Sequence, residues 1–237
     1  KVKTMLRRTS FAVSTDENRY VLNGLYLSFK ENKLTMVATD GRRLALAEEE
    51  VELPGESPME LIVPTKAIQE LSRQLGEEGN VKIQITENQV SFGLEEKEGT
   101  GSLIVSKLVE GAYPNYKQVI PAESKHRVTL DKEELFHALR RAEIMTSEKA
   151  NSVKLTFSEN NLTFTANSPE VGESRETMAI KYGGEETSIA FNPEFFIDPL
   201  KALEEDEVHF EFTDQLSPGV VKVNHPFLYV IMPMRTS

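Results

Sequence analysis

The chain has 237 residues, of which 39% are hydrophobic and 27% are charged. This composition allows one large or two ordinary packed domains and excludes a disordered chain. The absence of cysteine excludes a disulfide framework, a Cys-ligated metal site and a cysteine nucleophile. The longest uninterrupted apolar stretch, residues 227–232, is far shorter than the roughly 20 residues of a membrane-spanning helix, so we expect no membrane partner.

The sequence contains an internal repeat. Residues 26–40, YLSFKENKLTMVATD, align without a gap on residues 154–168, KLTFSENNLTFTANS, at an offset of 128. Residues 6–14 likewise align on 139–147. Self-similarity at this spacing predicts two copies of one folding unit, which we place at residues 1–118 and 119–237.

The first unit opens with apolar residues at helical spacing, which predict an amphipathic helix over residues 2–14. Alternating apolar runs on either side of KENK, residues 30–33, predict a β-hairpin. Pro64 is placed to be the first residue of a second helix that ends at Gly76. A further hairpin is expected at residues 85–92, and GTGS at 99–102 reads as a turn between two strands.

The second unit repeats this order, with a hairpin at residues 157–164 and a helix that begins at Pro193. It also opens with a strand-like segment, residues 126–130, for which the first unit has no room. We therefore expect the first strand of the first unit to be missing from this chain. The pattern predicts an α+β fold in which two tandem repeats each pack two helices on antiparallel sheets.

No catalytic or metal-binding motif stands out. The four histidines lack ligand spacing, and the acidic runs at residues 48–50 and 204–207 read as solvated ends of elements. We expect no enzyme activity, no catalytic residue, no metal and no cofactor. A hydrolase that acts in a cleft between the units stays open as an alternative.

Charge is segregated along the chain. The net charge is −11, yet residues 1–14 carry +4 and the remainder −15. Lysine and arginine also recur on predicted helix faces in both units, as in Lys66 and Arg73. Such faces can touch phosphates without reading bases. On charge alone, the plainer interpretation, that these residues only keep exposed helices soluble, is favoured.

Several motifs carry a resemblance to a known family. These are RYVLNG (19–24), VATDGRRLAL (37–46), LIVPTKAIQEL (61–71), SKLVEGAYPNY (106–116) and YVIMPMR (229–235). They follow one another over the whole chain as in the bacterial sliding clamp, the β subunit of DNA polymerase III, which the chain resembles. The resemblance implies the DNA-clamp fold, with residues 1–118 as the clamp's middle domain and 119–237 as its C-terminal domain.

The resemblance also implies a function. A full-length clamp is a ring of two subunits that encircles duplex DNA and acts as a processivity factor for DNA polymerase III in replication. Its implied partners are duplex DNA, the polymerase α subunit, the clamp loader δ subunit, and other polymerases and repair proteins. We expect a cytoplasmic protein and a monomer for this chain, and keep as an alternative a clamp-derived peptide-binding adaptor that does not encircle DNA. The DNA-facing residues implied are Lys3, Arg7, Tyr20, Lys66, Arg73, Arg140 and Lys201.

The second implied site is a groove that binds short peptides of the form Gln-Leu-x-Leu-Phe. Leu, Val, Pro and Met side chains offer adaptable apolar surface for bulky anchors. Without the resemblance, the TDG segment reads as a tight turn and the two late methionines as ordinary strand residues. The implied groove residues are Leu22, Thr39, Gly41, Arg42, Arg43, Leu44, Pro114, Val119, Asn192, Phe195, Leu216, Val230, Met232, Pro233, Met234 and Arg235.

Overall fold

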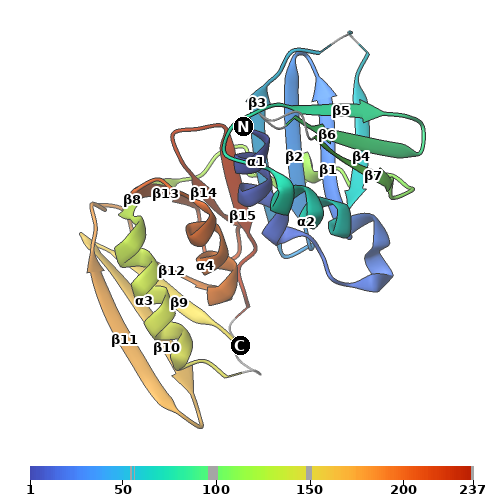
Figure 1. Cartoon of the computed structure of the whole chain (residues 1–237). Coiled ribbons are helices and arrows are strands. Elements are labelled where there is room, and N and C mark those ends of the chain that lie inside the picture. The colour runs from blue at the N-terminus through green and yellow to red at the C-terminus, as the bar shows by residue number, and fades with distance from the viewer. Residues whose placement is uncertain (54, 56, 96–100, 148–150, 236–237) are drawn as a thin grey trace. The chain divides into compact units, whose positions relative to one another are not determined.

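The computed structural model describes residues 1–53, 55, 57–95, 101–147 and 151–235. The chain forms two compact units, Lys1–Asn115 and Tyr116–Ser237 (Figure 1). Each contains helices packed on antiparallel sheets, which is the α+β organisation predicted from the repeat. The division falls three residues before the boundary that the sequence suggests.

Among the described residues, the first unit contains two α-helices, two short 3₁₀ segments and two sheets, and a third 3₁₀ segment follows directly after it. Strands β4-β1-β2-β3 form one antiparallel sheet, and β5-β6-β7 form the other. The elements are α1 (Val2–Thr9), η1 (Ser10–Ala12), η2 (Glu17–Leu22), β1 (Gly24–Lys30), β2 (Lys33–Thr39), β3 (Arg43–Glu50), β4 (Met59–Pro64), α2 (Thr65–Gln74), β5 (Val81–Ile85), β6 (Gln89–Leu94), β7 (Ser102–Lys107) and, just past Asn115, η3 (Tyr116–Val119).

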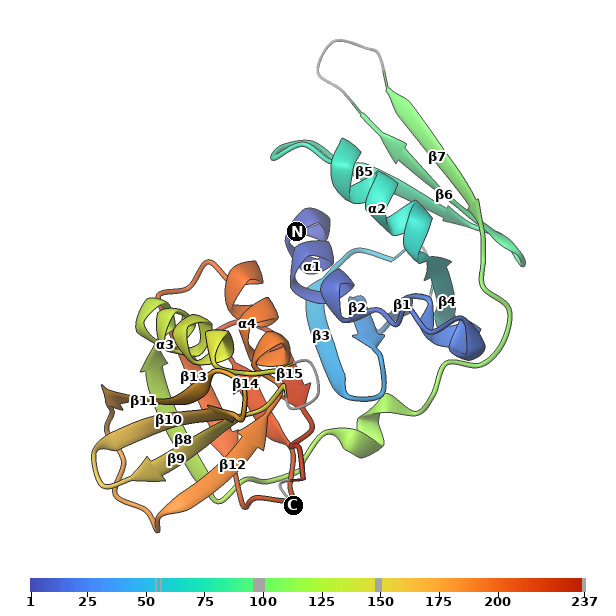
Figure 2. The ribbon, with the colours of Figure 1, turned by 90° about the horizontal axis from the view of Figure 1, so that it is seen from below.

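The second unit has the same organisation with one additional strand at its start. Its sheets run β11-β10-β9-β12 and β15-β14-β13-β8. Helices α3 and α4 lie side by side over them (Figure 2). The elements are β8 (His126–Asp131), α3 (Lys132–Ile144), β9 (Val153–Ser158), β10 (Asn161–Ser168), β11 (Gly172–Ala179), β12 (Thr187–Phe191), α4 (Pro193–Ala202), β13 (Glu207–Phe212), β14 (Gly219–Lys222) and β15 (Phe227–Ile231).

The structure confirms the repeat down to strand register. Lys30 pairs with Lys33 at the end of the first hairpin, and Ser158 pairs with Asn161 at the same place in the second. The first hairpin turns at Glu31 and Asn32, whose φ angles of 54° and 55° give the left-handed pair that matches the twist of antiparallel strands. The second hairpin keeps the same register although, of its two turn residues, only Asn160 has a positive φ, 53°.

The additional strand β8 marks the difference between the units. In the second unit, β13 lies between β14 and β8. The equivalent strand of the first unit, β5, pairs with β6 alone among the described residues. The strand predicted at residues 126–130 is thus present.

Each unit has its own apolar core. In the first, Met5 and Leu6 of α1 and Ile68 and Leu71 of α2 are buried together with the inward residues of the sheets. The second is built around aromatic rings, among which Phe157 and Phe212 stack with centroids 4.2 Å apart. Such offset ring pairs add to the stabilisation that burial gives.

Three local predictions need correction. The α-helix predicted over residues 2–14 ends at Thr9 and continues only as a 3₁₀ turn, because Thr9 has already left helical geometry at φ −124°. Pro64 is the N-cap of α2 and not its first helical residue, since its ψ of 144° is extended. Helix α2 ends at Gln74, before Gly76. Residues 99 and 100 of the predicted GTGS turn lie outside the described residues, although the flanking strands pair as expected.

Candidate functional site

The turn between β2 and β3 is held by its own side chains. The Asp40 carboxylate accepts hydrogen bonds from the backbone N–H groups of Arg42 and Arg43, at 2.9 and 3.1 Å. The Thr39 hydroxyl accepts from Gly41 N–H and donates to the Arg43 carbonyl. Gly41 has φ +86°, a conformation that L-residues rarely adopt. The predicted tight turn is therefore present, and it leaves the Arg42 side chain exposed.

Unlike the exposed side chain of Arg42, the side chain of Arg43 is largely buried. Its side chain is only 10% exposed, and its Nε donates to the Asp40 carboxylate at 3.1 Å. Its Nη2 donates to the Phe11 carbonyl at 3.3 Å, and the guanidinium lies over the Phe11 ring. Arg43 thus fastens the turn to η1 instead of offering charge to solvent.

Arg19 lies beside this turn although it is absent from the residues selected from the sequence. Its Nη1 donates to the Asp40 carbonyl at 3.2 Å, and its Nε lies 3.6 Å from the Asp16 carboxylate. A Cβ on Gly41 would meet the Arg19 guanidinium at 2.5 Å. The only sequence signal was its position as the first residue of the RYVLNG motif.

The remaining first-unit residues of the predicted groove differ in exposure. Leu22 and Leu44 are buried, while Thr39 is half-buried within the turn. Pro114 is exposed in the segment that follows β7. The first unit therefore offers a polar, preformed turn that is followed in the chain by the buried Leu44.

In the second unit, the candidates gather where β15 ends and α4 begins. The backbone N–H of Met234 donates to the Ala190 carbonyl at 2.7 Å, which fastens the tail to β12 two residues before the helix cap Asn192. The Tyr229 hydroxyl donates to the Phe195 carbonyl at 2.6 Å and holds α4 to β15. These two bonds bring Asn192, Phe195, Met234 and their neighbours into one cluster.

The methionines of this cluster are accessible. Met232 and Met234 are 40% and 37% exposed, with the half-buried Pro233 between them, and Arg235 is exposed. By contrast, Val230 is 1% exposed and is part of the core of the strand. The exposed methionines give the cluster adaptable apolar surface.

Asn192 and Leu216 have local roles that the sequence only partly indicates. The Asn192 side-chain oxygen accepts from Glu194 N–H at 3.0 Å, which caps α4.

Leu216 is exposed at the tip of the β13–β14 loop, where the Asp214 carboxylate accepts from the backbone N–H groups of Leu216 and Ser217. These hydrogen bonds lower the pKa of Asp214. Val119, at the end of η3, is also exposed.

The residues predicted to face DNA occupy the helices, except Tyr20. Arg7, Lys66, Arg73, Arg140 and Lys201 are exposed on α1, α2, α3 and α4, and Lys3 is half-buried. Tyr20 lies in η2, exposed, with its hydroxyl beside Gly111. The helices therefore present basic side chains in both units, as the sequence predicts.

Most of these basic residues are paired with carboxylates. Arg73 contacts Glu70 at 2.6 Å, and Arg140 contacts Glu143 at 2.9 Å. Lys201 lies 3.9 Å from Asp198, and Lys3 pairs with Glu77. Hydrogen bonds from Arg73 and Gln74 lower the pKa of Glu70, so this carboxylate stays charged beside its partner. On α2, α3 and α4, the basic residue thus pairs with an acidic one a single turn away, whereas the partner of Lys3 lies beyond the end of α2.

Within the described residues, no group of three or more His, Cys, Asp and Glu side chains could hold a metal ion. Two of the histidines make contacts within the second unit. His209 lies between Thr129 and Asn224 within hydrogen-bonding distance of both, and the ring of His126 packs on Phe212. No helix among the described residues is long and apolar enough to cross a membrane.

Comparisons with known proteins agree with this architecture. The family model described as DNA polymerase III beta subunit, central domain, matches residues 1–115. The model of the C-terminal domain of the same subunit matches residues 117–235. The beta sliding clamp of Chlamydia pneumoniae is 40% identical over 235 residues, which are 99% of this chain and 63% of that protein.

Solved structures of clamps have the same fold. The DNA polymerase III subunit beta from Pseudomonas aeruginosa superposes with a TM-score of 0.92 at 33% identity, covering 99% of this chain and 63% of that one. The sliding clamp from Bacillus subtilis gives 0.92 at 33% identity, with 100% and 62% covered. The fold is therefore that of DNA clamps. The chain belongs to the DNA polymerase III beta subunit family and spans about 63% of the length of the relatives that it matches.

Proposed function

We propose that this chain forms the central and C-terminal part of a sliding clamp, a ring that encircles duplex DNA and tethers replication proteins to it. The observation that carries the proposal is the pair of repeated units, each with exposed basic residues on its helices in a chain whose net charge is −11. An acidic body keeps direct affinity for DNA low, while a basic helical lining allows weak, sequence-independent phosphate contacts. Tethering then raises the effective concentration of a polymerase at its template.

The proposal includes partner binding at each of the two clusters described above, the β2–β3 turn with Arg42 in the first unit and the tail with Met232 and Met234 in the second. Exposed methionine suits bulky apolar anchors of varied shape, and a preformed turn needs little ordering when it binds. The proposed ligands are linear motifs of the DNA polymerase III α subunit, the clamp loader δ subunit and other polymerases or repair proteins. The role is one of binding, without catalysis, in the bacterial cytoplasm where the chromosome is replicated.

A labelled Gln-Leu-x-Leu-Phe peptide, titrated into the chain and followed by fluorescence anisotropy, tests the partner site. We expect saturable binding that Met232→Ala weakens by up to about ten-fold, because full burial of a methionine contributes roughly 1.5–3 kcal/mol and a ligand can cover only the 40% of this side chain that is exposed. Met145→Ala, at the end of α3 and outside both clusters, is the matched control and leaves binding unchanged. Binding that survives Met232→Ala unaltered would contradict the assignment of the tail.

DNA contact is tested separately with a short duplex at low ionic strength. We expect weak binding whose affinity falls with salt and is independent of sequence. Lys66→Ala, on the exposed face of α2, weakens it, whereas Lys181→Ala, at an exposed position after β11, does not. Light scattering on the same samples is expected to give a monomer. Peptide binding without any DNA contact would favour the adaptor that does not encircle DNA.

A further inference from the structure

The end of the first unit repeats the end of the second. Val109 N–H donates to the Ile62 carbonyl at 2.9 Å, as Met234 N–H donates to the Ala190 carbonyl at 2.7 Å. Ile62 and Ala190 are separated by the same offset of 128 residues that relates the two hairpins. Residues 107–109 are therefore the structural counterpart of the tail 232–234. The first unit has its own version of the tail cluster.

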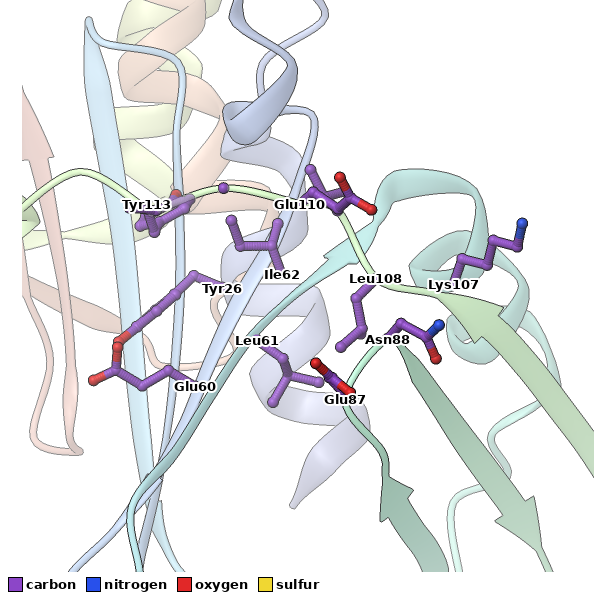
Figure 3. Close-up of a pocket in the computed structure, with 13 residues that line it drawn as sticks. Tyr26, Glu60, Leu61, Ile62, Glu87, Asn88, Lys107, Leu108, Glu110 and Tyr113 are labelled. Carbon is purple, nitrogen blue, oxygen red and sulfur yellow. The ribbon is translucent and has the colours of Figure 1, made fainter.

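A hollow of about 790 Å³ lies at this place in the first unit (Figure 3). It is bounded by β1, β4, the β5–β6 turn and the segment that follows β7. The Tyr26 and Tyr113 rings stack at one end, with centroids 4.8 Å apart and planes at 18°. Leu61 and Leu108 supply apolar wall between them and the turn.

The rim of the hollow is acidic. Glu60, Glu87 and Glu110 are exposed around it, against the single cation Lys107. None of the three carboxylates has an ion pair with another described residue. A ligand with positive charge would therefore find carboxylates that are not already neutralised.

The hollow also presents an open strand edge. Strand β4 pairs with β1 on one side. On the other side, the Ile62 carbonyl faces Val109. Backbone groups alternate in direction along an antiparallel strand, so Glu60, two residues earlier, presents its N–H and C=O toward that same side. An extended peptide could add to β4 there, with its backbone giving affinity and its side chains giving selectivity.

We propose that this hollow is a second docking site, which binds an extended segment of a partner protein with a Lys or Arg next to an apolar residue. The basic side chain meets the rim carboxylates, the apolar one packs against the stacked tyrosines, and the backbone pairs with β4 at Glu60. Charge complementarity selects this occupant over the Gln-Leu-x-Leu-Phe peptides proposed for the other site. A binding role shared with the tail rests on the proposed function, but the matching hydrogen bonds, the hollow, its charges and its open edge do not.

The probe is a fluorescein-labelled peptide, Lys-Val-Arg-Leu-Lys, titrated into the chain at about 0.15 M salt, where long-range attraction to an acidic body is screened. We expect saturable binding that the triple variant Glu60→Gln, Glu87→Gln, Glu110→Gln weakens about ten-fold. The matched control removes three exposed carboxylates of the second unit, in Glu133→Gln, Glu159→Gln, Glu186→Gln, and keeps the affinity. Equal weakening by both triple variants would show unspecific attraction and overturn the proposal.

Two further measurements separate this site from the proposed groove. With the glycines labelled for NMR, the Gly111 amide in the wall of the hollow is expected to shift on titration, while Gly41 in the β2–β3 turn stays in place. An excess of the Gln-Leu-x-Leu-Phe peptide is expected not to displace the basic probe. Displacement, or a shift of Gly41 without Gly111, would overturn the second site and leave the groove proposal intact. Failure of the groove peptide alone would leave the second site intact.

Discussion

The guanidinium of Arg43 donates to the carboxylate of Asp40 at 3.1 Å, with both side chains largely withdrawn from water. The same carboxylate accepts two backbone hydrogen bonds of the turn between β2 and β3. One side chain therefore neutralises the group that gives the turn its shape. The adjacent Arg42 has an exposed side chain and is available to a partner.

Arg43→Ala is expected to destabilise the first unit by about 1.5–3 kcal/mol, the usual range for losing hydrogen bonds to a charged group. Urea unfolding followed by circular dichroism measures this. Arg42→Ala serves as the control and is expected to change stability by less than about 0.5 kcal/mol, as exposed substitutions usually do. Similar losses for both variants would contradict the division of roles between the two arginines.

Glu70→Gln is expected to strengthen binding to duplex DNA. The change releases Arg73 from its 2.6 Å contact and removes one negative charge from the exposed face of α2. If Arg73 gains one phosphate contact, the slope of log affinity against log salt becomes steeper by up to about 0.9. Anisotropy titrations at several salt concentrations measure this slope.

Glu186→Gln removes an equal charge from an exposed position between β11 and β12 and is the control for Glu70→Gln. An unchanged slope in Glu70→Gln would mean that the carboxylate does not restrain Arg73. An equal change in both variants would mean that only total charge matters.

The charge of Asp214 is expected to stabilise the β13–β14 loop at neutral pH but not in acid. Hydrogen bonds from Leu216 and Ser217 lower its pKa in the folded protein below the ordinary value of 3.8. A lowered folded-state pKa gives stability above pH 3.8 that is lost as the pH falls through the folded-state value. Because the group is exposed, the effect is at most about 1 kcal/mol.

Comparing unfolding of Asp214→Asn with the unaltered chain tests this sign. The variant is expected to be less stable at about pH 7, and the difference to shrink as the pH falls below 3.8 and through the lowered folded-state pKa of Asp214, where the native carboxyl becomes protonated as well. A difference that is constant with pH would indicate lost shape and not lost charge.

Tyr229→Phe is expected to loosen α4 from β15. It removes the 2.6 Å hydrogen bond to the Phe195 carbonyl, and a bond of this kind contributes about 0.5–1.5 kcal/mol. If the helix start takes part in peptide binding, affinity falls together with stability. Tyr20→Phe, whose ring is exposed, is the control for both readings, and equal effects of the two variants would contradict this role of Tyr229.

Much of the fold could be predicted because the repeat carries local signals. The residues that form the hairpin turn at Glu31 and Asn32, and the proline that begins α4, are recognisable from their immediate neighbours in the sequence. The role of Arg43 was not predictable in this way, because the Phe11 carbonyl that it contacts lies 32 positions away. A contact between residues this far apart in the sequence is set by the tertiary fold and cannot be predicted from local patterns.

The candidate site shows the same limit. In an alternating strand, Met232 and Val230 would lie on the same face and be equally buried. The sequence does not show that β15 ends between them at Ile231, which leaves Met232 exposed and Val230 buried. Arg19 was overlooked because its contact is with the carbonyl of Asp40, a group that every residue carries. The pairing of Arg73 with Glu70 was readable from its spacing of three residues, which places side chains together on a helix.

The tail of the second unit is fixed by a main-chain hydrogen bond between Met234 and Ala190, and main-chain atoms do not change when a side chain is substituted. Residues 232 and 234 can therefore diversify without releasing the segment that carries them. Substitutions at these positions, natural or engineered, could change which partners bind, one position at a time, while the backbone hydrogen bond of the tail stays the same. A library restricted to these two positions would then vary in recognition far more than in folding.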